Sequence, residues 1–155
     1  MGGVEREQPK GYQGWTNYET WAVALWIGNE QGSYEYWERD QAGECYRDAV
    51  KEQLGEWAFG PSDDPAPVID RDRATRDAAY ELARRLKEEL DDEAETPRAV
   101  DGTMYADLLN AALQEVNWLE IAEHYVAEVD REQIEKEEVA EVRVESEEGE
   151  GDEVA

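Results

Sequence analysis

Apolar side chains recur at helical spacing in the first long patterned stretch, residues 14–27. The residues that share one face there are Tyr18, Trp21, Ala22, Leu25 and Trp26. Such a wide apolar face is typical of a helix that packs on a core. Thr16 and Glu19 have the spacing of a capping box, in which the hydroxyl and the carboxylate cap the first turn reciprocally. The stretch therefore predicts an aromatic-rich helix with Thr16 at its start and this face buried.

Four more stretches show helical periodicity. Residues 34–57 predict a helix with Ser33 as its N-cap and an interruption near Gly43, and residues 72–93 predict an Ala- and Leu-striped helix. Residues 103–116 and 118–129 predict two more, which the sequence also allows to be one bent rod. The face expected to be buried in the first of this pair comprises Tyr105, Leu108, Leu109, Ala112, Leu113 and Val116.

Polar, Gly-containing and Pro-rich segments outside these stretches set the predicted domain limits. Residues 1–13 are polar and Gly-containing, which indicates a flexible N-terminus, and residues 60–69 form a Pro-rich loop inside a helical domain of residues 14–129. Residues 130–155 are Glu-rich and predict an acidic tail, disordered by composition at 145–155. The predicted fold is an all-α, single-domain bundle of four or five helices with a disordered acidic C-terminal tail.

The charge is extreme for 155 residues, with 41 acidic and 15 basic side chains and a net charge of -26. A polyanion repels phosphate backbones and anionic lipids, so direct nucleic-acid binding and membrane association are not expected. Most of the charge lies outside the tail, and Lys is scarce compared with Arg. This acidic, Lys-poor composition favours a halophilic, salt-adapted host.

Compartment and cofactor are constrained by what the sequence contains. Cys45 is the single cysteine, and the chain shows neither a signal peptide nor an apolar run of membrane-spanning length. A cytoplasmic protein is therefore expected. One cysteine and one histidine are too few for a zinc site, and no phosphate-binding glycine loop is present, so no cofactor or metal is predicted.

Two motifs resemble those of a known family. One is the run Asn17-Tyr-Glu-Thr-Trp-Ala-Val-Ala-Leu-Trp-Ile27, and the other is Asp107-Leu-Leu-Asn-Ala-Ala-Leu-Gln-Glu-Val-Asn-Trp-Leu-Glu-Ile-Ala-Glu123. Together they resemble a domain-of-unknown-function family of small uncharacterised proteins from phages, plasmids and haloarchaea. The resemblance spans about residues 14–127. It implies a mobile-element accessory protein and brings no catalytic residues with it.

His124 is the one candidate for acid–base chemistry. Glu120 lies one helical turn before it, so a carboxylate-oriented general base is one interpretation and an ordinary surface pair is the other. The Glu-x-x-His pattern of di-metal bundles fails, because Ile121 stands where the glutamate is needed. We therefore predict that the protein is not an enzyme, with catalysis by His124 and Glu120 as an alternative.

Tryptophan is the most unusual feature of the composition, with six residues. Core packing and a binding patch are the two interpretations of such side chains, since tryptophan is favoured in both places. We assign as candidate partner-binding residues Trp15, Trp21, Trp26 and Trp118.

Three functional hypotheses follow. In the first, the protein is an accessory factor that binds an unidentified protein partner, and a homodimer is compatible with this role. In the second, it is a DNA mimic that inhibits a host nuclease or restriction system by presenting an acidic helix stripe. The residues of that stripe are Asp77, Glu81, Glu88, Glu89, Asp91, Asp92 and Glu93. The third is the enzyme based on His124.

Overall fold

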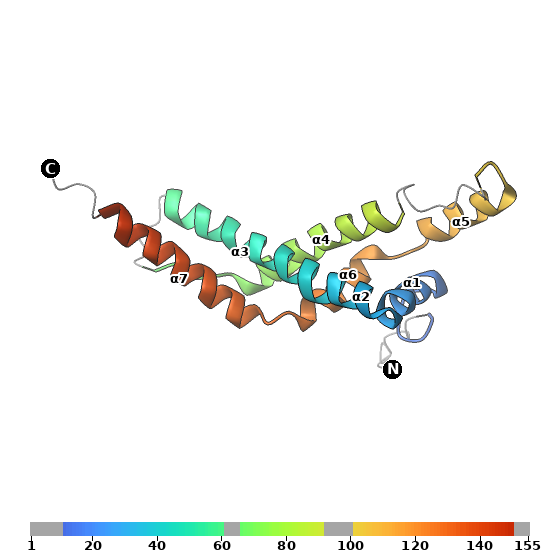
Figure 1. Ribbon diagram of the computed structural model, residues 1–155, viewed down its shortest axis with the longest axis horizontal. Helices are drawn as coiled ribbons and strands as arrows, with labels where there is room; N and C mark the ends of the chain where they lie inside the picture. The colour runs from blue at the N-terminus through green and yellow to red at the C-terminus, as the bar shows by residue number, and fades with distance from the viewer. Residues whose placement is uncertain (1–10, 61–65, 92–100, 151–155) are drawn as a thin grey trace, which may run out of the picture.

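The computed structural model describes residues 11–60, 66–91 and 101–150. Over these residues the regular elements are helices, with one isolated backbone bridge between Tyr12 and Trp15, which confirms the predicted all-α class (Figure 1). The elements are α1 (Tyr18–Asn29), α2 (Gln31–Tyr34), η1 (Glu35–Gln41), α3 (Ala42–Phe59), α4 (Arg71–Leu90), α5 (Met104–Gln114), α6 (Trp118–Glu128) and α7 (Arg131–Glu150).

One continuous helix runs from α2 through η1 into α3, and η1 is a π-helical segment. Its buried residues explain the π geometry. Trp37 and Ala42 both face the core although they are five residues apart, a spacing that an α-helix would place on different faces. The predicted cap at Ser33 is wrong, because the helix begins at Gln31 and the Ser33 hydroxyl donates to the Glu30 carboxylate. Gly43 lies inside α3 and does not interrupt it.

The core lies where α3, α4 and α6 meet. From α4 come the small side chains of Ala74, Ala78 and Ala79, which let the helices approach closely, and Leu82 and Leu86 fill the remaining space. Facing them are residues of α3 and α6, which are Cys45, Tyr46, Val50, Leu54, Ile121, Ala122 and Val126. The Ala and Leu stripe predicted for residues 72–93 is therefore the side of α4 that lies at the centre of the bundle. The α4 N-cap is Asp70, whose carboxylate accepts the Arg73 N–H at 3.1 Å.

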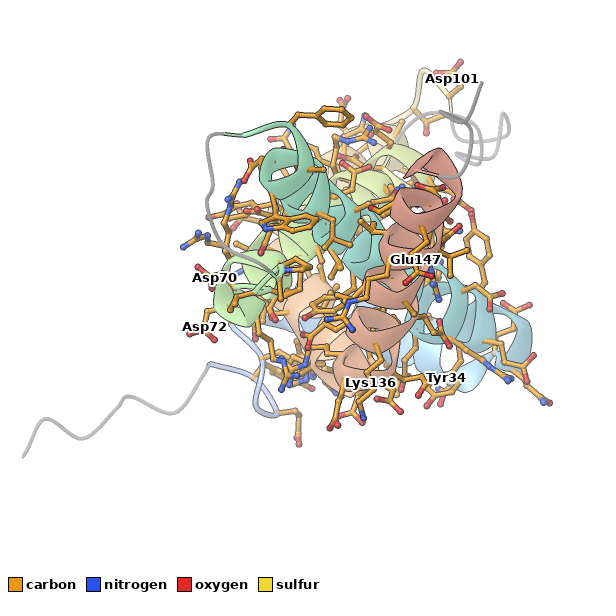
Figure 2. All side chains as sticks on the ribbon, turned by 90° about the vertical axis from the view of Figure 1, so that its left-hand side faces the viewer. Tyr34, Asp70, Asp72, Asp101, Lys136 and Glu147 are labelled. Atoms are coloured by element: carbon orange, nitrogen blue, oxygen red, sulfur yellow. The ribbon has the colours of Figure 1, made fainter. Side chains whose placement is uncertain are left out.

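The greatest departure from expectation is at the acidic C-terminus. Residues 131–150 form α7, so the tail is helical over this range and not disordered, and α7 packs along α3 (Figure 2). Ile134 is buried, and Val139 and Val142 pack against the core. Lys136 and Glu147 are exposed to solvent. Residues 151–155 lie outside the described residues.

Ion pairs explain how so acidic a helix packs. The Glu135 carboxylate accepts from Arg71 Nε and Nη2 at 2.8 and 2.7 Å and from the Tyr46 hydroxyl at 2.7 Å. Glu138 is buried and pairs with Arg47. The pKa of Glu135 is lowered chiefly by the hydrogen bonds from Arg71. Composition alone indicated disorder because it does not show that the arginines lie on the facing helices.

The last predicted pair of helices is two separate helices, α5 and α6, divided at Val116 and Asn117. α5 projects at the end of the molecule opposite the C-terminus, and α1 lies at the same end (Figure 1). Only the C-terminal part of α5 reaches the core, through Leu113 and the following Val116. No helix of the described residues is both long and apolar enough to cross a membrane.

Candidate functional site: a polar network and an exposed aromatic helix

A network of hydrogen bonds joins the start of α1 to the start of α6. At its centre is Thr20, which is fully buried. The Thr20 hydroxyl donates to Asn17 Oδ1 at 2.6 Å and accepts the backbone N–H of Asn117 at 2.9 Å. The Asn17 amide in turn donates to the carbonyl of Glu115 at 2.6 Å. Residues nearly one hundred positions apart in sequence are thereby held together.

Both helix starts in this network are capped by asparagine. Asn17 Oδ1 accepts the N–H of Thr20 at 2.9 Å, and Asn117 Oδ1 accepts the N–H of Glu120 at 3.1 Å. Asn117 stands between the stretches 103–116 and 118–129, which were predicted as two helices or one bent rod, and it is the N-cap of α6. The capping box at Thr16 is wrong, because the cap lies one residue later and Thr16 has another partner.

That partner is Glu120, whose side chain closes the network. Its carboxylate accepts from the Thr16 backbone N–H at 3.2 Å and from the Thr16 hydroxyl, and the residue is only 5% exposed. A buried carboxylate is tolerated when donors surround it, as here. The chain reaches Thr16 through a tight turn in which Gly14 has a φ of 86°. Glycine adopts this left-handed conformation at little cost.

The geometry gives Glu120 and His124 different surroundings. Glu120 is buried in the network, whereas His124 is exposed and its ring lies 4.3 Å from the ring of Trp15, centroid to centroid. The catalytic alternative needed the carboxylate to orient the imidazole. In the structure the carboxylate accepts hydrogen bonds from Thr16 and Asn117, and the imidazole stacks on an indole.

The aromatic face of α1 points away from the core, which overturns the prediction that it is buried. Trp26 is 76% exposed, Tyr18 55% and Leu25 39%. The side of α1 that packs inward carries Thr20, Val23, Ala24 and Ile27. We call the opposite side, formed by Tyr18, Trp21, Ala22, Leu25 and Trp26, the outer face of α1. Because α1 is apolar on both sides, its periodicity did not show which side is buried.

Aromatic contacts organise one end of this outer face. The rings of Tyr12 and Trp21 lie 5.0 Å apart, those of Tyr12 and Tyr18 5.1 Å, and those of Tyr18 and Trp21 5.5 Å, all between centroids. Distances of this size are favourable for aromatic pairs. Residues 11–13, predicted as part of a flexible N-terminus, therefore include a side chain that packs on α1.

The four candidate partner-binding tryptophans lie in different surroundings. Trp26 and the half-buried Trp21 belong to the outer face of α1. Trp15 is half-buried against the core and His124, and Trp118 is buried in the core. The structure thus brings two of the four together on one surface and places the other two in or against the interior.

α5 carries a second exposed apolar surface. Met104 and Tyr105 are each largely exposed, Leu108 is exposed on the same side, and Leu109 lies at its edge. We call Met104, Tyr105 and Leu108 the outer face of α5. The prediction that Tyr105, Leu108 and Leu109 are buried is wrong, because α5 contacts the core only near its C-terminus.

Three of the seven acids in the stripe proposed for DNA mimicry pair with arginines of the same helix. Arg84 bridges Glu81 and Glu88 at 2.7 and 2.6 Å, Arg85 also pairs with Glu81, and Asp77 lies 3.6 Å from Arg73. The hydrogen bonds from Arg84 and then Arg85 lower the pKa of Glu81 to about 2. Asp92 and Glu93 lie outside the described residues. The stripe is therefore partly neutralised by arginines of its own helix.

Other reactive groups are also engaged or buried. Burial raises the pKa of the Cys45 thiol to about 11, which keeps it protonated and weakly nucleophilic. A cavity of about 360 Å³ lies between η1 and the α6–α7 junction. Two of its polar lining groups bond within the protein: the Tyr34 hydroxyl donates to Glu38 at 2.7 Å, and Arg47 pairs with Glu137 and Glu138. Among the described residues, no three His, Cys, Asp or Glu side chains are placed to hold a metal ion.

Sequence reasoning missed the central position of Thr20. It predicted the helices at residues 14–27 and 118–129 separately and did not connect their starts. A signal was present, since Thr20 is a polar residue on the side of α1 that also carries Val23 and Ile27. A polar residue at such a position indicates a buried hydrogen-bonding partner.

Comparison with known proteins finds a matching family for the part of the chain that contains the motif at residues 17–27. A search of curated proteins and a search of solved structures each returned no match. Residues 8–59 match the model of a family described as a family of unknown function, DUF7249. The match covers α1 and the long helix through α3, and residues 107–123 of the second motif lie outside it. The predicted resemblance to a domain-of-unknown-function family is thereby confirmed, and over residues 8–59 the chain is similar to DUF7249.

Proposed function

We propose that this protein is a non-catalytic protein-binding module that acts through the outer face of α1. The observation that carries the proposal is the 76% exposure of Trp26, next to exposed Tyr18 and Leu25, on a helix whose start is joined to α6 by the polar network. Large aromatic side chains that a fold leaves in solvent are typical of interaction sites. The helix lies within the segment that matches the family model.

The geometry of the face supports this role. Tyr18, Trp21 and Leu25 follow the i, i+3, i+7 spacing with which an amphipathic helix presents anchors to another protein. Asn17 and Thr20 secure the N-terminal turn, so little conformational entropy is lost when the face is covered. We propose that an accessory role in a virus, plasmid or halophilic host uses this surface.

A site-specific photo-crosslinking residue at position 25 tests the proposal in cells that make the protein. The matched control carries the same residue at position 80, because Tyr80 is also exposed but lies on α4. We expect an adduct with one defined protein from position 25 and none from position 80. The crosslinked protein is then purified and titrated against the wild type and Trp26→Ala, and we expect Trp26→Ala to weaken binding about tenfold or more.

Two outcomes contradict the proposal. One is equal crosslinking from positions 25 and 80, which would indicate collisions with no specific face. The other is an unchanged affinity of the purified partner for Trp26→Ala. Circular dichroism of each variant keeps the comparison to folded protein.

The acidic surface supports salt adaptation more than DNA mimicry. The negative charge is spread over α3, α4 and α7, and three acids of α4, Asp77, Glu81 and Glu88, pair with arginines of the same helix. A melt in rising potassium chloride tests this hypothesis. Salt adaptation predicts a melting temperature that keeps rising into the molar range, beyond simple screening of surface charge. A melting temperature that stays flat above about 0.15 M contradicts it.

A further inference from the structure

Charge is nearly absent from the two helices that carry exposed apolar faces. α1 contains a single charged residue, Glu19, and α5 contains a single one, Asp107. The chain as a whole has 41 acidic and 15 basic residues. Exposed large apolar side chains and a lack of charge thus coincide on the same two helices, while α3, α4 and α7 are densely charged.

This distribution has a direct consequence for self-association. Two copies with a net charge of -26 each repel one another, and the repulsion is greatest where acidic surfaces face each other. Contact between copies is favourable only where apolar surface is buried and acids are sparse. The outer faces of α1 and α5 meet both conditions. A basic partner, by contrast, would be attracted to the acidic helices.

The two faces lie on helices at the same end of the molecule. α1 and α5 are at the same end of the molecule, and the bond from the Asn17 amide to the Glu115 carbonyl ties the start of α1 to the residue that follows α5 (Figure 1). A helix of α5's length is about 16 Å long, too short alone for the roughly 800 Å² per partner of a stable interface. Adding α1, about 18 Å long, brings an interface of that size within reach.

We propose that the outer faces of α1 and α5 together form an isologous interface with a second copy of this chain. The inference rests on the proposed function, because it names the protein that covers the outer face of α1. In a two-fold arrangement each face meets apolar surface of the other copy, so no complementary charge is required. Salt strengthens the association, since it screens the repulsion between the acidic bodies without weakening apolar contact.

Sedimentation equilibrium of the full chain tests this inference. Raising potassium chloride from about 0.1 M to about 1 M shortens the Debye length from about 10 Å to about 3 Å. We expect the dimer dissociation constant to fall about tenfold or more over this range. At about 1 M salt, Trp26→Ser and Leu108→Ser should each raise it about tenfold. The matched control is Phe59→Ser, which removes a 95% exposed aromatic ring from the far end of α3 and should leave it unchanged.

Three results overturn the inference. The first is a chain that stays monomeric at both salt concentrations. If position 25 then crosslinks to a different protein, the proposed function still stands although the dimer inference is wrong. A dimer that Phe59→Ser weakens and Trp26→Ser does not weaken places the interface elsewhere. A dimer that salt weakens shows that ion pairs join the copies. If Trp26→Ser or Leu108→Ser unfolds the chain, Trp26→Gln and Leu108→Gln replace them with the same expectations.

Discussion

The Thr20 hydroxyl accepts the backbone N–H of Asn117 at 2.9 Å and donates to the side chain of Asn17 at 2.6 Å. One small buried hydroxyl thus connects two helix caps that are far apart in the sequence. A valine has nearly the same shape and neither hydrogen-bonding function.

Thr20→Val is therefore expected to destabilise the protein by about 1–3 kcal/mol, because the backbone N–H of Asn117 and the side-chain oxygen of Asn17 each lose a partner. Urea denaturation followed by circular dichroism measures the change. Thr75→Val is the control, since the bond that the Thr75 hydroxyl accepts from Arg131 is longer, at 3.3 Å, and the residue is half-buried. An equal loss in both variants would contradict a special position for Thr20.

Trp26→Ala is expected to change the free energy of unfolding by less than about 0.5 kcal/mol, because its ring lies mostly in solvent. Trp118→Ala should cost about 3–5 kcal/mol, since Trp118 is buried in the core. The same denaturation experiment measures both. A large loss for Trp26→Ala would mean that the outer face of α1 stabilises the fold.

Ile134→Ala tests whether α7 belongs to the folded domain. Ile134 is buried, so its truncation should cost about 2–4 kcal/mol. Val144→Ala, at an exposed position of the same helix, should cost less than about 0.5 kcal/mol. Two equally neutral variants would show that α7 does not contribute to stability.

Glu135 predicts a pH dependence. Arg71 lowers the pKa of Glu135 in the folded chain, so the carboxylate stabilises the protein above its ordinary pKa of about 4.3. This contribution is lost as the pH falls through the lower folded pKa. At neutral pH, Glu135→Gln should cost about 1–2 kcal/mol, and the difference from the wild type should shrink at about pH 3 and below. Glu147→Gln, on the exposed side of α7, is the control and should cost less than about 0.5 kcal/mol at neutral pH.

Periodicity predicted the helices well where only one side is apolar. α4 is the clear case, since its Ala and Leu stripe is the side that packs. In α1 both sides are apolar, and the choice between them depends on Thr20 meeting Asn117, a long-range contact that no local pattern contains. The prediction of a disordered tail, where the structure has α7, was wrong for a related reason. The glutamates of α7 are stabilised by Arg47 and Arg71, which lie on other helices.

The candidate site was predicted in part. Trp21 and Trp26 were identified from composition and lie on the exposed surface, whereas Trp118 is a core residue. Tryptophan content alone does not separate these two roles, because the same indole suits both a core and an interface. The outer face of α5 was missed, because its apolar side chains are those that a buried helix would carry.

The π-helical turn in η1 has a consequence for the direction of the chain before it. If the same residues wound as ordinary α-helix, everything N-terminal to the turn would rotate by about 100° relative to α3. Trp37 would then leave the interior, and α1, which is joined through α2, would swing away from its cap-to-cap contact with α6. The winding of this turn thus sets the direction of the aromatic helix, although no residue of the turn lies on that helix.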